Sequence, residues 1–290
     1  MKAPPFEYHR PSSLDEALGL LAELDEAKIL AGGQSLLPLM SLRLGRPEHV
    51  VDIGDLGILD SLVVEPDGSV RVGALVTHRQ VETSAEVAAH APLLHAAAPM
   101  IGHRPIRTRG TVCGSIAHAD PAAEMPAVAL ACNAAITAVS SRAAREIAAA
   151  DFFEGYLQTV IEPDEIVTRV QFGPWPRHRR GAVVEQSRRS GDYAIIGLAC
   201  WLDIEDNTIT DAALSFFGVS DTPIRVAEAE DVLRGQAPTQ STFSAAGRTA
   251  AGVLRPTSDI HASANYRRHL AAVLTERGLA KATAESGETR

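Results

Sequence analysis

The feature that most constrains the fold of this chain is the adjacent pair Gly32-Gly33, which lies between a short apolar segment and a helical pattern. Residues 28–31 predict a strand, residues 35–44 predict a helix, and residues 49–53 predict a second strand. This order is typical of a βαβ unit, and a capping-box pattern with helical apolar spacing at 13–24 places one more helix before it. The Gly-Gly turn would then be the ligand-facing end of the unit.

Small residues at such a turn favour an anionic ligand, because the backbone can approach a diphosphate closely and free N–H groups at a helix start attract negative charge. A purely structural turn is the alternative. Asp52 follows about twenty residues later and mimics the acidic ribose ligand of a Rossmann fold. The fingerprint GxGxxG is missing, which makes an NAD domain the weaker interpretation. The candidate binding residues here are Ala31, Gly32, Gly33, Gln34 and Ser35.

The rest of the pattern predicts an α+β (mixed α/β) protein in several parts. Residues 62–73 form a hairpin pattern around Pro-Asp-Gly. A mixture of helices and strands follows, with a capping-box pattern from Thr77 to Gln80 before a helix and an irregular stretch at 102–120. The Pro-rich segment 173–176 and the basic run 177–180, interpreted as a solvated linker, predict a boundary. Three antiparallel strands, the last two joined by a turn at Asp206-Asn207, and three helices should follow. The predicted parts are residues 1–57, 58–176 and 177–282, with a disordered tail at 283–290.

Two further segments could contact the same ligand. Thr111-Val112-Cys113-Gly114-Ser115 offers small and hydroxyl residues before a helix that we expect to begin at Pro121. The segment 188–194 is a polar turn whose tyrosine could cover an aromatic ring system or simply pack at a strand end. His118 and Asp120 could form a catalytic pair, but no nucleophile lies nearby in the sequence, and this interpretation is the weaker one.

Composition excludes several classes of function. A net charge of -9 argues against general nucleic-acid binding, which depends on phosphate neutralisation by Lys and Arg. We find no signal peptide and no apolar run of membrane-spanning length, so the chain is expected to be cytoplasmic. The three cysteines are widely spaced and predict neither disulfides nor an iron-sulfur site. The ten histidines lack a ligand spacing such as HExxH, so we predict no metal site.

The three segments, in this order and at these separations, resemble the medium, FAD-binding subunits of the xanthine dehydrogenase and aerobic carbon monoxide dehydrogenase family, which are molybdenum hydroxylases. The C-terminal segments 218–225 and 259–268 resemble the same family. The resemblance implies a two-part FAD-binding domain of the vanillyl-alcohol-oxidase-like type, followed by a small domain with a three-stranded antiparallel sheet and helices. Residues 31–35 look like the first FAD loop of the family, residues 111–115 like its second, and residues 190–194 like the segment whose tyrosine lies against the isoalloxazine.

The resemblance also implies which residues bind the cofactor. Besides the first loop, they are Thr111, Gly114, Ser115, Ala119, Glu124, Asp192 and Tyr193. The second loop of the family commonly reads Thr-Ile-Gly-Gly, and Cys113 here replaces the first glycine, which would strain the cysteine if the position required a positive φ. Glu185 stands where many relatives carry lysine, so no cofactor role is assigned to it.

By the same resemblance, the chain would be the electron-transfer subunit of a heterotrimer. An iron-sulfur small subunit carrying [2Fe-2S] and a molybdopterin large subunit would be its partners, in a dimer of heterotrimers. FAD would pass electrons to an external acceptor, and no side chain of this chain need be catalytic. A self-contained FAD-dependent oxidoreductase acting directly on a small molecule is the alternative, and a nucleotide-binding module without enzymatic activity is a third possibility.

Overall fold

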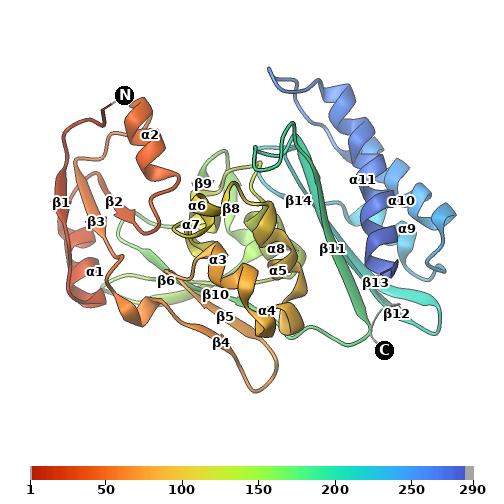
Figure 1. Ribbon diagram of the computed structural model, residues 1–290, viewed down its shortest axis with the longest axis horizontal. Helices are drawn as coiled ribbons and strands as arrows, with labels where there is room; N and C mark the ends of the chain where they lie inside the picture. The colour runs from red at the N-terminus through yellow and green to blue at the C-terminus, as the bar shows by residue number, and fades with distance from the viewer. Residues whose placement is uncertain (1, 285–290) are drawn as a thin grey trace.

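A computed structural model describes residues 2–284 of the 290-residue chain. Figure 1 shows three sheets that follow one another along the long axis of the molecule, each built from a consecutive stretch of sequence. The predicted tail at 283–290 lies outside the described residues except for its first two, which belong to the last helix. No helix of the described chain is both long and apolar enough to cross a membrane.

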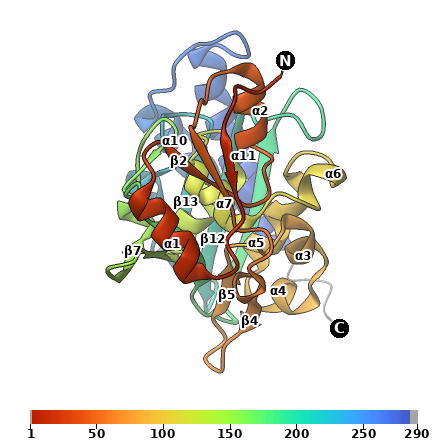
Figure 2. The ribbon, with the colours of Figure 1, turned by 90° about the vertical axis from the view of Figure 1, so that its left-hand side faces the viewer.

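The N-terminal sheet is parallel and has three short strands. It lies at the left of Figure 1 and faces the viewer in Figure 2. In spatial order the strands are β1 (Glu7–His9), β3 (His49–Asp52) and β2 (Ala27–Leu30). Helix α1 (Leu14–Glu23) precedes β2, and helix α2 (Leu36–Leu42) connects β2 to β3. The predicted βαβ unit with a preceding helix is confirmed, whereas β1 is additional.

The predicted start of α1 is confirmed, with a small difference in the capping box. The Ser13 hydroxyl accepts the Glu16 N–H at 3.1 Å, as a capping box requires. The Glu16 carboxylate, however, accepts the backbone N–H of Ser12 at 2.7 Å instead of that of Ser13. The helix therefore still begins where its sequence indicates, and it buries Leu18 and Leu21 against the sheet.

The central sheet is antiparallel, and its strand order joins distant parts of the sequence. In that order its strands are β4 (Leu62–Val64), β5 (Val70–Gly73), β10 (Ile166–Phe172), β6 (Ala135–Val139) and β7 (Ala144–Ala148). The small hairpin of β8 (Phe153–Gly155) and β9 (Gln158–Thr159) lies beside it. Strands β4 and β5 form the predicted hairpin, while β7, β8 and β9 were not predicted.

Short helices cover the central sheet. They are α3 (His78–Thr83), α4 (Ala85–His90), α5 (Pro92–Ala97), α6 (Arg104–Arg107), α7 (Val112–His118) and α8 (Glu124–Ala131), with the 3-10 turns η1 (Gly57–Leu59), η2 (Ala98–Met100) and η3 (Ala149–Asp151). The capping box predicted at Thr77 is present, with Gln80 as its partner.

Two expectations for this region were wrong. The stretch 102–120 is not irregular, because α6 and α7 occupy much of it, and α7 begins where the Thr111 hydroxyl accepts the Gly114 N–H at 3.0 Å. Pro121 does not begin the next helix either. It lies in the preceding turn, where its carbonyl accepts the Gly218 N–H at 2.7 Å. Pro126 falls in the first turn of α8, where its missing N–H breaks no helical hydrogen bond, so no kink is needed.

The C-terminal sheet is antiparallel and has four strands rather than three. They are β11 (Arg179–Gln186), β12 (Ile196–Glu205), β13 (Thr208–Phe217) and the two-residue β14 (Ile224–Arg225). Helices α9 (Ala227–Leu233), α10 (Gln240–Val253) and α11 (Ala264–Ala284) cover its outer face, at the right of Figure 1. The tight turn predicted at Asp206-Asn207 is present, and both residues have positive φ.

Only the first half of the basic run 177–180 is solvated, because residues 179 and 180 already belong to β11. Arg179 is already part of β11 and donates two hydrogen bonds, at 2.7 and 2.8 Å, to the carboxylate of Asp203 on β12. Its guanidinium carbon lies 3.7 Å from the ring centre of Trp201 and 5.5 Å from that of Trp175. A bidentate ion pair combined with cation-π contact fixes this arginine in place.

Helix α8 joins the central and C-terminal sheets. All eight of its residues are buried, and it contacts both β12 and β13. At the last residue of α8, the Ala131 carbonyl accepts the indole N–H of Trp201 at 2.7 Å inside the core. The two sheets therefore share one continuous interior rather than meeting at a solvated interface.

Trp201→Phe should lower stability by about 1–3 kcal/mol, because the substitution leaves the buried Ala131 carbonyl without its donor. The midpoint of urea unfolding, followed by circular dichroism, measures the change. Trp175→Phe is the matched control, since the Trp175 indole N–H has no hydrogen-bond partner within residues 2–284, and it should have a smaller effect. Equal midpoints for Trp201→Phe and the unmodified protein would contradict this role.

Candidate functional site

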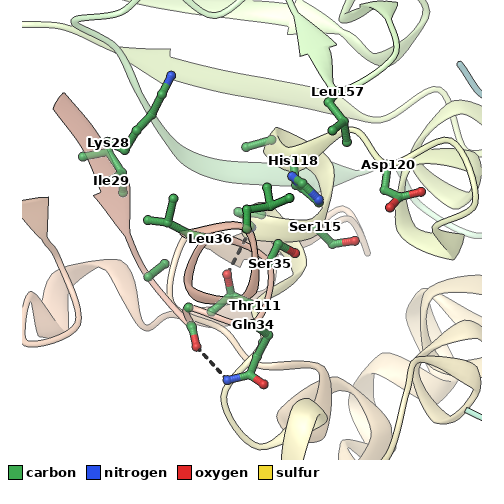
Figure 3. Close-up of a pocket in the computed structure, with 18 of the residues that line it drawn as sticks. Lys28, Ile29, Gln34, Ser35, Leu36, Thr111, Ser115, His118, Asp120 and Leu157 are labelled. Carbon is green, nitrogen blue, oxygen red and sulfur yellow. Dashed lines mark hydrogen bonds between the residues drawn. The ribbon is translucent and has the colours of Figure 1, made fainter. Parts of the chain in front are cut away.

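A cavity of about 1090 Å³ lies between the N-terminal and central sheets. Figure 3 shows side chains from β2, α2 and α7 around the same space. The cavity is also lined by Gly191, Asp192 and Tyr193, which lie just before β12 in the sequence. Three segments that are distant in sequence thus face one cavity.

The first loop, 31–35, is held against residues 109–110, just before the second loop, by a contact that only glycine permits. A Cβ atom on Gly32 would lie 2.0 Å from the carbonyl oxygen of Arg109, which is backbone and cannot move aside alone. Gly33 has a φ of +71°, a left-handed conformation that side chains rarely adopt. The two glycines therefore perform different tasks, close approach at the first and turn geometry at the second.

The first loop presents unpaired donors to the cavity. The backbone N–H groups of Gly33, Gln34 and Ser35 make no hydrogen bond with any residue in the described part of the chain. The Gln34 side chain donates to the Gly32 carbonyl at 3.2 Å, which steadies the loop (Figure 3). Free N–H groups at the start of a helix are suited to phosphate oxygens.

The second loop forms the first turn of α7. The residues Thr111, Gly114 and Ser115 line the cavity, and Thr111 is fixed by the cap hydrogen bond described above. Cys113 has no positive φ, so the strain that a glycine replacement could have caused is absent. Its thiol is buried and lies 3.4 Å from the Val72 carbonyl, and burial raises the pKa of Cys113 to about 12. At neutral pH it is a packed thiol rather than a reactive thiolate.

Glu124 brings an unusual carboxyl group to the cavity wall. Its side chain is 7% exposed, and burial, together with the nearby carboxyls of Glu185 and Asp120, raises its pKa to about 8. Burial also raises the pKa of Glu185 to about 7, and one oxygen of that carboxyl is buried without a hydrogen-bond partner in residues 2–284. Glu124 is therefore mostly protonated at pH 7 and can donate a hydrogen bond.

Most of the residues expected at the site do line the cavity. They are Ala31, Gly32, Gly33, Gln34, Ser35, Thr111, Gly114, Ser115, Glu124, Asp192 and Tyr193. Tyr193 is 68% exposed, as an aromatic side chain at a cavity rim should be if it covers a ligand. Ala119 is not among the lining residues, because it forms the buried left-handed cap that ends α7. Its predicted role in binding has no support from this placement.

The catalytic pair considered from sequence does not form. His118 and Asp120 both line the cavity, but no hydrogen bond joins their side chains in the described structure. The Asp120 carboxylate instead accepts the Ala122 N–H at 2.9 Å, and burial lowers the pKa of His118. The two residues lack the base-orienting contact that a catalytic pair requires.

Sequence patterns missed several polar residues of the cavity, namely Lys28, Arg43, Arg46 and His78. His78 is buried, its Nδ1 has no hydrogen-bond partner within residues 2–284, and burial lowers its pKa to about 4. An unpartnered polar atom in a cavity wall indicates a place for a ligand group. Isolated histidines and isolated basic residues carry no sequence signal for such a role.

Together these features define a class of protein that binds a long anionic cofactor between two small-residue loops. The free N–H groups, the glycine contact and the orphaned Nδ1 of His78 all suit a dinucleotide.

Comparison with known proteins identifies the family. The model of the FAD-binding domain in molybdopterin dehydrogenase matches residues 4–175, and that of the carbon monoxide dehydrogenase flavoprotein C-terminal domain matches residues 182–282. The chain belongs to this family of FAD-binding oxidoreductase subunits.

Relatives match along the full length of the chain. The nicotine 6-hydroxylase medium subunit of Paenarthrobacter nicotinovorans is 40% identical over 99% of this chain and 100% of the relative. A chain of carbon monoxide dehydrogenase from Hydrogenophaga pseudoflava superposes with a TM-score of 0.95 at 34% identity, covering 98% of this chain and 99% of that one. A chain of quinoline 2-oxidoreductase from Pseudomonas putida 86 gives 0.94 at 36% identity, covering 99% of each. The expected fold class and FAD cofactor are thereby confirmed.

Gly32→Ala should lower FAD affinity by about tenfold or more, because the added Cβ must push the first loop away from Arg109 and out of the geometry that holds the cofactor. The ratio of absorbance at 450 and 280 nm after gel filtration measures retained flavin. Gly19→Ala on α1 is the matched control, since no atom lies within 4 Å of the added carbon. Stoichiometric FAD in a folded Gly32→Ala protein would overturn the assignment.

Glu124→Gln should flatten the dependence of stability on pH. The pKa of Glu124 is raised from 4.5 to about 8, so the folded state holds more protons than the unfolded state between these values. Stability therefore falls as pH rises through this range, by an amount on the order of a few kcal/mol. Glutamine cannot ionise, so the variant should gain stability relative to the unmodified chain between pH 5 and 9.

Urea unfolding at several pH values tests this expectation in the full-length chain. Some slope should remain in the variant, because the raised pKa of Glu185 acts in the same direction. Identical slopes for the two proteins would show that Glu124 ionises freely in the folded state.

Proposed function

We propose that the chain is the FAD-binding electron-transfer subunit of a heterotrimeric molybdenum hydroxylase, passing electrons from a partner iron-sulfur subunit to an external acceptor. The observation that carries the proposal is the match over nearly the full length to relatives named medium subunit or medium chain. Such names belong to one member of a larger assembly. One related structure is described as lacking the Mo-pyranopterin moiety of its molybdenum cofactor, which supports molybdenum chemistry on a partner subunit.

In this proposal the two loops hold the diphosphate from both sides. The N–H groups of Gly33, Gln34 and Ser35 would bind the diphosphate on one side, and the hydroxyls of Thr111 and Ser115 would bind it on the other. Lys28, Arg43 and Arg46 add positive charge around the same cavity.

The chain also positions the flavin ring. Tyr193, at the rim of the cavity with Asp192 beside it in sequence, would contact the flavin ring. Protonated Glu124 can donate a hydrogen bond without placing negative charge in the cavity. When bound, FAD supplies the redox chemistry, and these residues bind, orient and tune it.

The proposed partners are an iron-sulfur small subunit carrying [2Fe-2S] and a molybdopterin large subunit, in a dimer of heterotrimers. The substrate would be chosen by the large subunit, because no acid-base pair or nucleophile with an orienting partner lines the described cavity. The expected location in the cytoplasm stays a prediction, as do the boundaries of the three parts of the chain.

Native purification of the tagged chain tests this function. We expect two further polypeptides to elute with it and the complex to contain FAD, molybdenum and iron, measured by absorbance and by elemental analysis. The chain should also remain yellow when it is purified without its partners, because the residues that bind FAD are its own.

Two results would favour the alternatives. A chain that elutes alone, and whose flavin is bleached directly by a small-molecule substrate, would be a self-contained FAD-dependent oxidoreductase. A colourless, folded chain would be a nucleotide-binding module without redox function, contrary to both proposals.

A further inference from the structure

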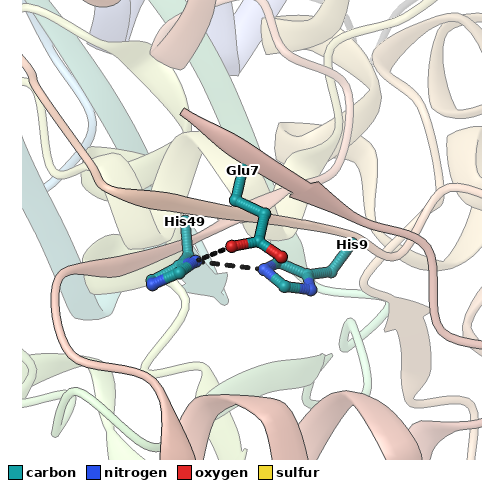
Figure 4. Close-up of side chains that lie close together, drawn as sticks. All are labelled: Glu7, His9 and His49. Carbon is teal, nitrogen blue, oxygen red and sulfur yellow. Dashed lines mark hydrogen bonds and ion pairs between the residues drawn. The ribbon is translucent and has the colours of Figure 1, made fainter. Parts of the chain in front are cut away.

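Three potential metal ligands meet on the N-terminal sheet, in a place that the flavin site does not use. Glu7 and His9 of β1 and His49 of β3 place one ligand atom each within 4.8 Å of one another (Figure 4). None of the three lines the cavity.

The backbone register brings these side chains together. Glu7 lies directly beside His49 in the parallel pairing of β1 with β3, and His9 follows two residues later, so all three project from one face of the sheet. The Glu7 N–H donates to the Glu48 carbonyl at 2.8 Å, and the Tyr8 hydroxyl donates to Asp52 at 2.6 Å from the opposite face. The strands are therefore held in place independently of the cluster.

The nitrogen atoms of the two histidines have the spacing of ligands on one ion. The His9 Nε2 and the His49 Nδ1 are 3.1 Å apart, and two nitrogens at about 2.0–2.1 Å from a zinc ion lie roughly 3 Å apart. The ring planes are tilted by 50° with centroids 5.2 Å apart, so the rings converge through their nitrogens and do not stack. Glu7 Oε2 lies 3.7 Å from the His49 Nδ1 and needs only a small side-chain rotation to complete the set.

The carboxylate of Glu7 is also available. Within residues 2–284, no Lys or Arg forms an ion pair with it. The nearby guanidinium of Arg10 is instead paired with Asp55. A hydrogen bond between the two imidazoles would explain their short distance, but it gives no role to a carboxylate that approaches the same nitrogen.

We propose that Glu7, His9 and His49 form a binding site for a divalent transition-metal ion of the zinc type, with the remaining position open to solvent. Two imidazoles and a carboxylate suit zinc and its neighbours in the first transition series, whereas magnesium and calcium prefer oxygen ligands. The ion cross-links β1, a three-residue edge strand paired only with β3, to the centre of the sheet. The site is separate from the flavin cavity.

The sequence did not predict this site, because its ligands lie on two strands forty residues apart. Local spacing rules such as HExxH detect ligands on one helix, and they cannot detect a cross-strand pair.

Zinc binding to the full-length chain tests the proposal, after chelator treatment and dialysis. Isothermal titration with zinc chloride should show one site per chain, and zinc should raise the thermal unfolding temperature, because the ion binds only where the strands are paired. X-ray absorption at the zinc edge should show two imidazole ligands.

Variants separate this site from adventitious binding. His9→Gln and His49→Gln should each lower the affinity by about tenfold or more and abolish the thermal shift. Glu7→Gln should weaken binding without affecting the fold, because this side chain is exposed. His269→Gln, an exposed histidine on α11, is the matched control and should change neither readout.

All variants should retain FAD, because the cluster lies outside the cavity. The proposal is overturned if the unmodified chain takes up no stoichiometric zinc, or if His9→Gln and His49→Gln bind it as tightly as the His269→Gln control.

Discussion

The approach of the Gly32 backbone to the Arg109 carbonyl is the constraint on which the site depends. It lets loops from two different sheets touch without intervening side chains, so a single narrow ligand can contact both. The second loop is held in turn by hydrogen bonds from His78 N–H to Gly110 and from Val112 N–H to Val76, at 2.9 and 3.0 Å. The cavity is thus defined by main-chain geometry, and its side chains add charge and specificity.

Local sequence signals predicted much of the fold. The Gly-Gly turn, the caps at Ser13 and Thr77 and the Asp206-Asn207 turn act through neighbouring residues, and the structure confirms each of them. Apart from the five-residue β7, the strands that escaped prediction are short. Strand β1 has three residues and β14 has two, and such segments acquire their structure from pairing with a distant strand rather than from their own periodicity.

The sequence predicted the site residues whose role depends on local backbone geometry. It missed the features that depend on contacts between residues far apart in the sequence. Gly32 and Thr111 stand out in the sequence because their local turn or cap requires their side-chain types. The raised pKa of Glu124 depends on burial and on Glu185, sixty residues away, which no local pattern reveals. Arg179 shows the same limit, since its ion pair is partly buried only because β12 places Asp203 beside it.

The complete burial of α8 has a consequence for how this protein can be recombined. The central part of the chain covers α8 on one side, and the C-terminal sheet covers it on the other. The helix is therefore part of the core of both, although it lies in the central part of the sequence. Chimeras that exchange the C-terminal part between relatives would inherit a mismatched interior unless α8 moved with the sheet that covers it. The natural unit of exchange therefore crosses the boundary that the proline-rich segment marks in the sequence.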